Sequence, residues 1–191
     1  MIKRFLPVAL LFSVLSACGL PNGVLVSPDA HHLGGNLFIE SNSVGDKFLV
    51  LDGEITPETA KTFERIVESH GPRSLVIAQS PGGHLIASHQ IGRTLSAERM
   101  NTVVLVNCIS ACVDIFIAGK KREMTEIAEL GLHAATNRDV SYELDRRYWR
   151  EFGFSSVNEA AYKVSNRDIW IIDAARAREL RMATAIIPVD S

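Results

Sequence analysis

From residue 36 onward, short apolar runs alternate with segments in which apolar residues recur at helical spacing. The runs SLVIA and TVVLV are continuous and apolar, a pattern typical of strands that are buried on both faces of a parallel sheet. The other strand predictions depend on shorter runs. In chain order, we expect strands at residues 36–40, 47–51, 74–78, 102–106, 130–134 and 184–188.

Helical patterns lie between these runs. Thr56 is a typical N-cap with Pro57 at the first helical position, and Phe63, Ile66 and Val67 would form the apolar face of that helix. Strands that alternate with helices predict right-handed crossovers and a largely parallel sheet, which is an α/β fold in a single domain. Further helices are expected from 84 to about 97, from 110 to 118, within 141–164, where the polar pattern predicts projection from the body, and from 173 to 181.

The amino-terminal segment has a different pattern. Lys3 and Arg4 precede an apolar run from Phe5 to Leu15, which is the layout of a secretory signal over residues 1–17 and is too short to span a bilayer stably. The sequence Leu-Ser-Ala-Cys at residues 15–18 resembles the lipobox of bacterial lipoproteins. That resemblance implies a lipidated Cys18 that anchors the protein to a membrane. The alternative is an ordinary signal followed by an incidental cysteine.

The residue after the cysteine and the segment that follows it refine this expectation. Gly19 stands where an Asp would favour the inner membrane, so the resemblance implies the periplasmic face of the outer membrane. Residues 18–35 mix Gly, Pro, Asn and His without periodicity, which predicts a tether, with the domain over residues 36–191. His31 and His32 within that tether are expected to be solvated rather than to bind a metal.

Charge and composition narrow the classes of function. The chain has 20 basic and 22 acidic residues, and residues 1–17 contain two of the basic ones, so a mature chain would keep 18 against 22, a formal charge of −4. An acidic chain of this kind argues against a nucleic-acid partner. Its 47% hydrophobic content argues against disorder. We expect no cofactor and no metal.

Two loops after predicted strands have residues suited to chemistry. Gly82-Gly83 follows the SLVIA strand, where backbone N–H groups can approach a developing oxyanion without obstruction, although a tight turn alone would also need glycine there. Ser110 follows the TVVLV strand at the start of an apolar helix, which suits a nucleophile or a simple N-cap.

Cys108 and Cys112 flank the second loop. In an oxidising compartment, cysteines at positions i and i+4 near a helix start are close enough for a disulfide, which would fix the turn that presents Ser110. The alternative is two small thiols packed against the sheet. We predict the disulfide.

A serine nucleophile requires a base and a group that orients the base. His133 ends the strand LGLHA, and Asp168 lies in NRDIW after the expected projecting helices. Taken alone, the first is typical of a core histidine and the second of a surface acid.

These motifs together resemble those of one family. Residues 48–187 are similar to the Clp protease proteolytic subunit and its crotonase-like relatives, above all to periplasmic Clp-protease-like proteins. The resemblance depends on four motifs that have the order and loop lengths of the family. They are SPGG at 80–83, Ser110-Ala111 followed by IFIAG at 115–119, GLH at 131–133, and Arg167-Asp168 followed by AREL at 177–180 and Ile186-Ile187.

The resemblance implies a serine peptidase of the cell envelope that acts on peptides or unfolded proteins. It implies Ser110 as the nucleophile, His133 as the general base, Asp168 as the group that orients the imidazole, and the N–H groups of Gly83 and Ala111 as the oxyanion hole. The segment from His133 to Asp168 is shorter than in the ring-forming protease, so a double-ring chamber is not expected, although a homo-oligomer is. The periplasm lacks ATP, so we expect no ATP-driven partner.

Alternatives remain open. One is a catalytically inactive peptide-binding module on the same fold, and another is a crotonase-like enzyme that acts on acyl groups. A Ser–Lys dyad with Lys120 or Lys121 is a weaker possibility. Asp114, on the apolar helix, would either raise the pKa of a neighbour or cap a cavity. Three aromatic residues, Tyr148, Trp149 and Trp170, are expected in the core, with a substrate groove as the alternative.

Overall fold

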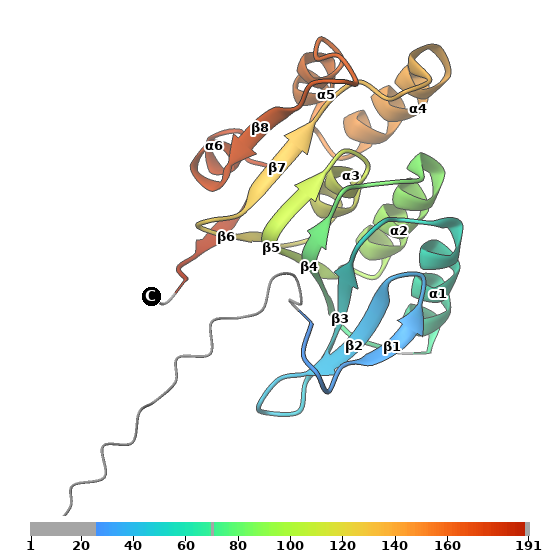
Figure 1. Ribbon diagram of the computed structural model, residues 1–191, viewed down its shortest axis with the longest axis vertical. Coiled ribbons are helices and arrows are strands. Elements are labelled where there is room, and N and C mark those ends of the chain that lie inside the picture. The colour runs from blue at the N-terminus through green and yellow to red at the C-terminus, as the bar shows by residue number, and fades with distance from the viewer. Residues whose placement is uncertain (1–25, 70, 190–191) are drawn as a thin grey trace, which may run out of the picture.

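The computed structural model describes residues 26–69 and 71–189, and the strands of this part form one mixed sheet with helices packed against it (Figure 1). The order β1-β2-β3-β4-β5-β6-β9 runs along the sheet. The first half of β5 pairs with β6, and its second half pairs with β7, which in turn pairs with β8. The strands are β1 (His31–Gly34), β2 (Leu37–Ser41), β3 (Lys47–Asp52), β4 (Ser74–Ser80), β5 (Asn101–Ile109), β6 (Arg122–Thr125), β7 (Glu129–Leu132), β8 (Trp170–Asp173) and β9 (Ala185–Ile187).

The sheet is mostly parallel. The pairs from β3 through β9 and the pair of β5 with β7 are parallel, whereas β1-β2-β3 and β7-β8 are antiparallel. The predicted α/β fold with a largely parallel sheet is therefore confirmed. The helices are α1 (Pro57–Glu68), α2 (Leu85–Ala97), α3 (Cys112–Ile117), α4 (Arg138–Glu151), α5 (Ser155–Ala161) and α6 (Ala174–Glu179).

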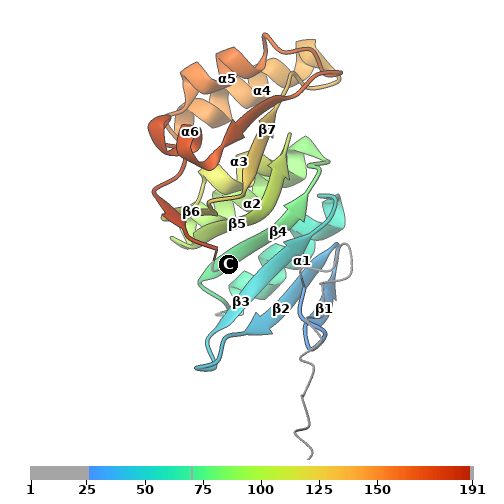
Figure 2. The same cartoon turned by 60° about the vertical axis from the view of Figure 1, so that its left-hand side comes forward.

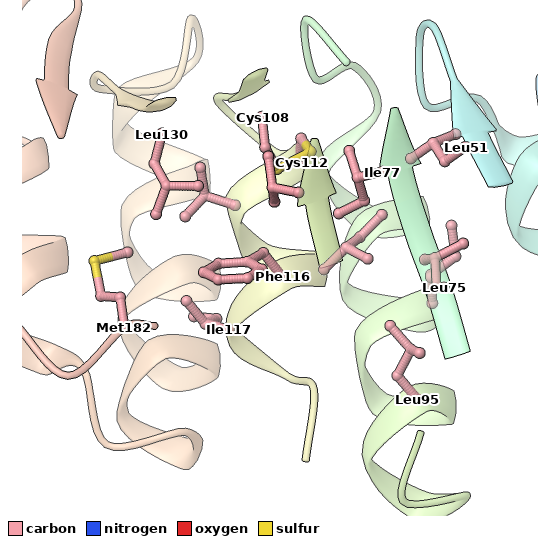
Figure 3. Packing of buried hydrophobic residues seen from close by; sticks show 14 of the residues in the cluster. Leu51, Leu75, Ile77, Leu95, Cys108, Cys112, Phe116, Ile117, Leu130 and Met182 are labelled. Carbon is pink, nitrogen blue, oxygen red and sulfur yellow. A yellow bond between two sulfur atoms is a disulfide. The ribbon is translucent and has the colours of Figure 1, made fainter. Parts of the chain in front are cut away.

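The two continuous apolar runs form the centre of the sheet. They become β4 and β5, which pair in parallel with Val76 opposite Val103. Ile77 and Val104 are fully buried. Figure 3 shows part of the core between these strands and the neighbouring helices, with Ile77, Leu95 and Phe116 in the same cluster as Cys108 and Cys112. One face of the two strands is fully buried, whereas Val76 and Val103 on the other face are half-buried, so the predicted burial on both faces holds in part.

The segment predicted to be a tether is folded from residue 26 onward, which corrects the expected start of the domain. Val26 is buried, and β1 pairs antiparallel with β2. Gly35, with a φ of +58°, lies against the first turn of α1, where the Thr59 hydroxyl donates to its carbonyl at 2.5 Å. Glycine and histidine concealed a short edge strand here, because neither residue type produces an apolar alternation. Residues 1–25, including the expected signal and Cys18, lie outside the described part.

The sequence pattern also did not predict two further strands, β6 and β8. The apolar content of β6 is low, and the position of β8 is unusual. β6 begins with charged residues, yet the Arg122 guanidinium donates to the carbonyls of Gly119, Arg181 and Met182, so the arginine fastens the strand to the chain leading into β9. β8 is a short edge strand after α5. Ile171 on this strand is 44% exposed.

α1, α2 and α6 start within one residue of the predicted positions, whereas α3 starts at Cys112 rather than Ser110 and α4 starts at Arg138, before residue 141. Thr56 caps α1 through a capping box with Thr59, and Pro57 is its first residue. The expectation that residues 141–164 project from the body is wrong for one face of α4. Tyr148 on that face is fully buried, and its hydroxyl donates to the Asp114 carbonyl at 2.7 Å. Within residues 26–69 and 71–189, no helix is both long and apolar enough to cross a membrane.

The parallel strands determine where the functional loops meet. Because β4, β5 and β7 run in the same direction, the loops that follow their carboxyl ends all lie at one end of the sheet. Figure 2 shows α4 and α5 at the opposite end of the molecule from β1 and β2. The segments at residues 81–84, 110–111 and 133–137 are therefore neighbours in space.

Candidate active site

Ser110 lies in the turn between β5 and α3 and has a backbone conformation that serine rarely adopts. Its φ is +56°, in the left-handed region. Its N–H donates to the Gly131 carbonyl at 2.7 Å, and its own carbonyl accepts from Val113 at 2.9 Å. The N-cap of α3 is Ala111, so Ser110 does not cap the helix. Its half-buried hydroxyl makes no hydrogen bond with any residue that the structure describes.

A disulfide joins the two cysteines that flank this turn. Cys108 ends a buried part of β5, Cys112 begins α3, and their Cα atoms are 5.3 Å apart. Both are fully buried, and Figure 3 shows the bond at the top of α3. The bridge thus encloses Ser110 in a loop of five residues that is held at both ends.

The Gly82-Gly83 loop lies directly against the serine turn. A Cβ on Gly82 would lie 2.6 Å from the Ile109 carbonyl oxygen and 2.9 Å from the Ser110 Cβ, so only glycine fits there. Gly83 bridges to Ile55 as in a parallel sheet: Ile55 donates to the Gly82 carbonyl, and His84 donates to the Ile55 carbonyl. This pairing leaves the Gly83 N–H directed away from Ile55.

The N–H groups of Gly83 and Ala111 make no hydrogen bond within the described chain. Both residues line the same pocket as Ser110. Two unpaired donors beside a serine hydroxyl are what stabilisation of an oxyanion requires.

His133 follows β7 and lines the pocket together with Ser110. Its Nδ1 lies 2.9 Å from the carbonyl oxygen of Ala134, which accepts when Nδ1 carries the proton. That tautomer leaves Nε2 as the basic nitrogen. No hydrogen bond joins His133 to Ser110 among the described residues, and in ligand-free sites such bonds are often long.

The structure does not place Asp168 next to Ser110 and His133. It lies in the loop between α5 and β8, is exposed, and its side chain makes no hydrogen bond with a described residue. It does not line the pocket. Its role as the group that orients the histidine therefore stays a prediction.

The alternative base is placed unfavourably. Lys120 and Lys121 follow the carboxyl end of α3, whereas Ser110 precedes its amino end. Both lysines are exposed, and neither lines the pocket. This placement argues against the Ser–Lys dyad.

The pocket has a volume of about 430 Å³ and extends from the serine turn to α4 and α5. Ser110 and His133 are half-buried at one side, whereas Asp145 and Asn158 are 6% and 2% exposed at the other. The remaining lining residues are Gly83, His84, Leu85, Ile86, Ala111, Asp114, Leu132, Ala135, Thr136, Asn137, Val140, Ser141, Leu144, Trp149, Ala161 and Tyr162.

A buried ionic cluster of His89, Asp114 and Asp145 lies at the closed side of this pocket. His89 Nε2 is 3.5 Å from Asp114 Oδ2 and 3.1 Å from Asp145 Oδ1. Asp114 also accepts from the Ser88 hydroxyl at 2.9 Å and from Trp149 Nε1 at 2.8 Å. The cluster joins α2, α3 and α4, and Asp114 thus connects helices through a polar network rather than simply capping a cavity.

Burial and charge act in opposite directions on the titration of this cluster. Burial lowers the pKa of His89, but the interactions with the Asp114 and Asp145 carboxylates outweigh it and raise that pKa from 6.5 to about 9. His89 is therefore protonated at neutral pH. Burial raises the pKa of Asp114, and the hydrogen bond from His89 opposes that rise.

Within the described chain, His89, Asp114 and Asp145 are also the group whose ligand atoms lie close enough together to hold a metal ion. In the described structure both oxygens of Asp114 accept from protein donors, and His89 lies at ion-pair distance from both aspartates. The three residues are thus arranged as an ion-pair network. The other candidate, His31-His32, is exposed on β1, with the His32 ring against Phe38.

Sequence reasoning missed His89, Asp145 and Asn158, and noticed Asp114 without a partner. The available signal was a polar residue on an otherwise apolar helix face: Asp145 lies one turn before Tyr148 and Trp149, the two residues by which α4 packs. Tyr148 is core, as expected. Trp149 is 3% exposed and also lines the pocket, whereas Trp170 is half-buried on β8.

Comparisons with known proteins identify structures that resemble this chain. No family model matches the sequence, and no curated protein matches it. Solved structures do match, and three of them are 16–21% identical to this chain. The ClpP protease catalytic domain from Plasmodium falciparum is 20% identical with a TM-score of 0.59, over 74% of this chain and 85% of that one. ClpP1 from Listeria monocytogenes is 21% identical with a TM-score of 0.60, over 75% of this chain and 92% of that one.

A mutant of the membrane-bound stomatin-specific protease 1510-N matches as well. It is 16% identical with a TM-score of 0.53, over 73% of this chain and 77% of that one. At these identities the likeness establishes the fold. The chain therefore has the ClpP-like, crotonase-type fold.

Proposed function

We propose that this protein is a serine peptidase that hydrolyses peptide bonds with Ser110 as the nucleophile and without ATP. The observation on which this proposal rests is the serine turn. Ser110 is held at a φ of +56° with a free hydroxyl, next to the unpaired N–H groups of Gly83 and Ala111. Strained backbone of this kind persists where the surroundings enforce it, and it clusters at active sites.

In the proposed reaction, the Ser110 oxygen attacks the carbonyl carbon of the scissile bond while His133 Nε2 takes its proton. The N–H groups of Gly83 and Ala111 donate to the resulting oxyanion. His133 then gives the proton to the leaving amine, and the acyl-enzyme forms. A water molecule, deprotonated by the same histidine, hydrolyses the ester and regenerates the serine.

In the proposed mechanism, the Nδ1 proton of His133 has two candidate acceptors, the Ala134 carbonyl and the Asp168 carboxylate. In the described state the acceptor is the Ala134 carbonyl, which fixes the tautomer. Asp168 would serve in the same role after a movement of its exposed loop, and would add charge stabilisation of the imidazolium. Asp168→Asn separates the two, because it affects the rate only if the aspartate reaches the histidine during the reaction.

A fluorophosphonate probe tests the nucleophile, since it labels an activated serine and leaves an ordinary serine untouched. We expect labelling of the wild-type protein, none in Ser110→Ala, a strong loss in His133→Ala and a smaller loss in Asp168→Asn. Ser156→Ala, which removes an exposed serine elsewhere, is the matched control and should label normally, as should Lys120→Ala. Circular dichroism checks the fold of each variant.

The competing function is a peptide-binding module without turnover. The missing hydrogen bond between Ser110 and His133 in the described state favours it. A wild-type protein that resists the probe, yet binds unfolded peptides in a calorimetric titration, would establish the binding module and end the peptidase proposal.

We also infer that the protein is anchored through a lipidated Cys18 at the periplasmic face of the outer membrane. The support is the Leu-Ser-Ala-Cys sequence after an apolar run and the Gly19 that follows it. In that setting the substrate would be a peptide or an unfolded protein of the envelope.

A further inference from the structure

The pocket beside Ser110 changes character with depth. Around the opening, the apolar residues Ile86, Val140 and Leu144 are 44%, 61% and 37% exposed and lie among exposed polar ones, His84, Thr136 and Asn137. At the closed side, Asp145 and Asn158 are more than nine-tenths buried. A group entering from the serine side therefore meets these apolar side chains before it meets the Asp145 carboxylate.

Three buried polar atoms at the closed side have no hydrogen-bond partner within the described structure. They are Asp145 Oδ1, Asn158 Nδ2 and His89 Nε2. The other oxygen of Asp145 accepts from the Tyr162 hydroxyl, and Oδ1 lies 3.1 Å from His89 Nε2 without the alignment of a hydrogen bond. Leaving a buried polar atom unpaired costs about 1–3 kcal/mol, more for a charged group. A ligand that donates to Asp145 would remove this cost.

The charges of the residues around the pocket indicate that its ligand is positively charged. Among the described residues, the pocket is lined by two carboxylates, Asp114 and Asp145, and by no lysine or arginine. The cation that the described structure places against them is His89, behind the lining. Asp114 accepts hydrogen bonds from Ser88 and Trp149, whereas Asp145 accepts one from Tyr162 and faces His89 through Oδ1 at 3.1 Å without a hydrogen bond. One imidazolium for two carboxylates leaves room for one more positive charge.

We propose that this pocket binds a lysine or arginine side chain of the substrate, with its terminal cation on Asp145, and so makes the enzyme selective for cleavage after basic residues. This specificity rests on the proposed peptidase function. A side chain that combines an aliphatic stem with a cationic end fits a pocket that has apolar side chains around its opening and a carboxylate at its closed side. Because Ser110, Gly83 and Ala111 line the same pocket, its occupant belongs to the residue that supplies the scissile carbonyl.

A neutral amide is the chemical competitor. A glutamine side chain would donate to Asp145 Oδ1 and accept from Asn158 Nδ2, but it would leave the charge of the carboxylates uncompensated. Charged partners in a buried site bind more strongly than neutral ones. We therefore expect the order lysine, then glutamine, then norleucine, an apolar residue of nearly the same length as lysine.

Diphenyl phosphonate probes with lysine, glutamine or norleucine at this position test the order, because they label the serine at a rate that depends on the side chain in the pocket. We expect the lysine probe to label wild-type protein at least about tenfold faster than the norleucine probe. Equal rates, or a faster norleucine or glutamine probe, would overturn the inference. A general fluorophosphonate that still labels Ser110 would show that the peptidase proposal survives that result.

Two variants test the role of Asp145. Asp145→Asn keeps the shape and removes the charge, and Ser141→Lys places a cation one helical turn away, within reach of Asp145, so that the protein fills its own pocket. Both should reduce the ratio of lysine to norleucine labelling to about one. Asp139→Asn, the same substitution at an exposed position of α4, is the matched control and should keep the wild-type ratio. If Asp145→Asn fails to fold, the labelling ratio of Ser141→Lys still tests whether Asp145 binds the cation.

A binding measurement covers the case in which no probe labels the protein. Calorimetric titration of the Ser110→Ala protein with acetyl-Ala-Ala-Lys-amide and its norleucine and glutamine counterparts needs no catalysis. Tighter binding of the lysine peptide supports the cation pocket even where the peptidase proposal has failed. No preference among the three peptides would refute the pocket whatever the outcome with the probes.

Discussion

At the scale of single residues, the serine turn is held by contacts from three sides. A non-glycine residue in the left-handed region costs about 1–2 kcal/mol. Ser110 stays there because Gly131 accepts from its N–H, the disulfide closes the turn, and Gly82 lies against its Cβ. The geometry of the hydroxyl is therefore determined by neighbours that never touch the substrate.

Gly82→Ala should disrupt the turn. The new Cβ would approach the Ile109 carbonyl and Ser110, so we expect a loss of about 2–4 kcal/mol in the free energy of unfolding by urea, and a loss of fluorophosphonate labelling. Gly45→Ala is the matched control: its φ of +89° is close to the +92° of Gly82, but its Cβ would meet nothing within 4 Å. It should cost about 1 kcal/mol and leave labelling intact. Equal costs in the two variants would contradict the crowding argument.

The sequence identified these residues because each belongs to a short local motif. Ser110 and the two glycines occupy turns after apolar strands, and His133 ends a strand. Asp145 and Asn158 have no such context. They become pocket residues only because two helices fold back over the end of the sheet, which no local pattern records.

At the scale of elements, the buried cluster ties α2, α3 and α4 together. His89, Asp114 and Asp145 come from three helices and are separated by dozens of residues along the chain. Replacing the cluster by apolar residues need not destabilise the protein, but breaking it leaves a charge without a partner. The orientation of α4 over the pocket therefore depends on the charge state of one histidine.

The cluster predicts a pH dependence of stability. The pKa of His89 is about 9 in the folded protein and 6.5 in the unfolded one, so its contribution is complete below about pH 6.5 and is lost as the pH rises towards 9. The raised pKa of Asp114 acts with the same sign. Urea unfolding at several pH values should show a decrease of up to about 3 kcal/mol over this interval.

The decrease in the free energy of unfolding between pH 6.5 and 9 should depend on His89. We expect His89→Gln, although less stable, to lose this decrease, and His31→Gln, which removes an exposed histidine, to keep it. An NMR titration of the imidazole measures the pKa of His89 directly. Stability that is constant or rising between pH 6.5 and 9 in the wild-type protein would contradict the ion-pair description.

The sheet and most helices could be predicted, whereas the edges could not. β4 and β5 lie in the middle of the sheet, where one face is fully buried and the other is partly buried, so their sequences are continuous and apolar. β1 and β6 are edge or partly polar strands whose stability comes from neighbours, such as Thr59 on Gly35 and Arg122 on three carbonyls. An apolar pattern in the sequence predicts a strand only where its side chains are buried, and few side chains of β1 and β6 are fully buried.

At the scale of the whole molecule, anchoring is the prediction that fractionation can test. Cys18→Ala should move the protein from the membrane fraction to the soluble one, because the lipid-bearing thiol is lost. Gly19→Asp is the matched control: it should stay membrane-bound but shift to the inner membrane. Mass spectrometry of the amino-terminal peptide should find acyl chains in the wild type. Identical fractionation of wild type and Cys18→Ala, with no acyl chains, would end the lipoprotein interpretation.

The early start of β1 limits how far the protein can stand from a bilayer. Seven residues lie between Cys18 and Val26, and the eight Cα–Cα steps across them span at most about 29 Å. Figures 1 and 2 show β1 and β2 at one end of the long axis and α4 with α5, which cover the pocket, at the other. Val26 packs against Val50 and Ala78 of β3 and β4, so an anchor at Cys18 would keep the sheet within this distance of the lipid. The pocket would then work in the layer next to the membrane surface, on substrates that reach this layer.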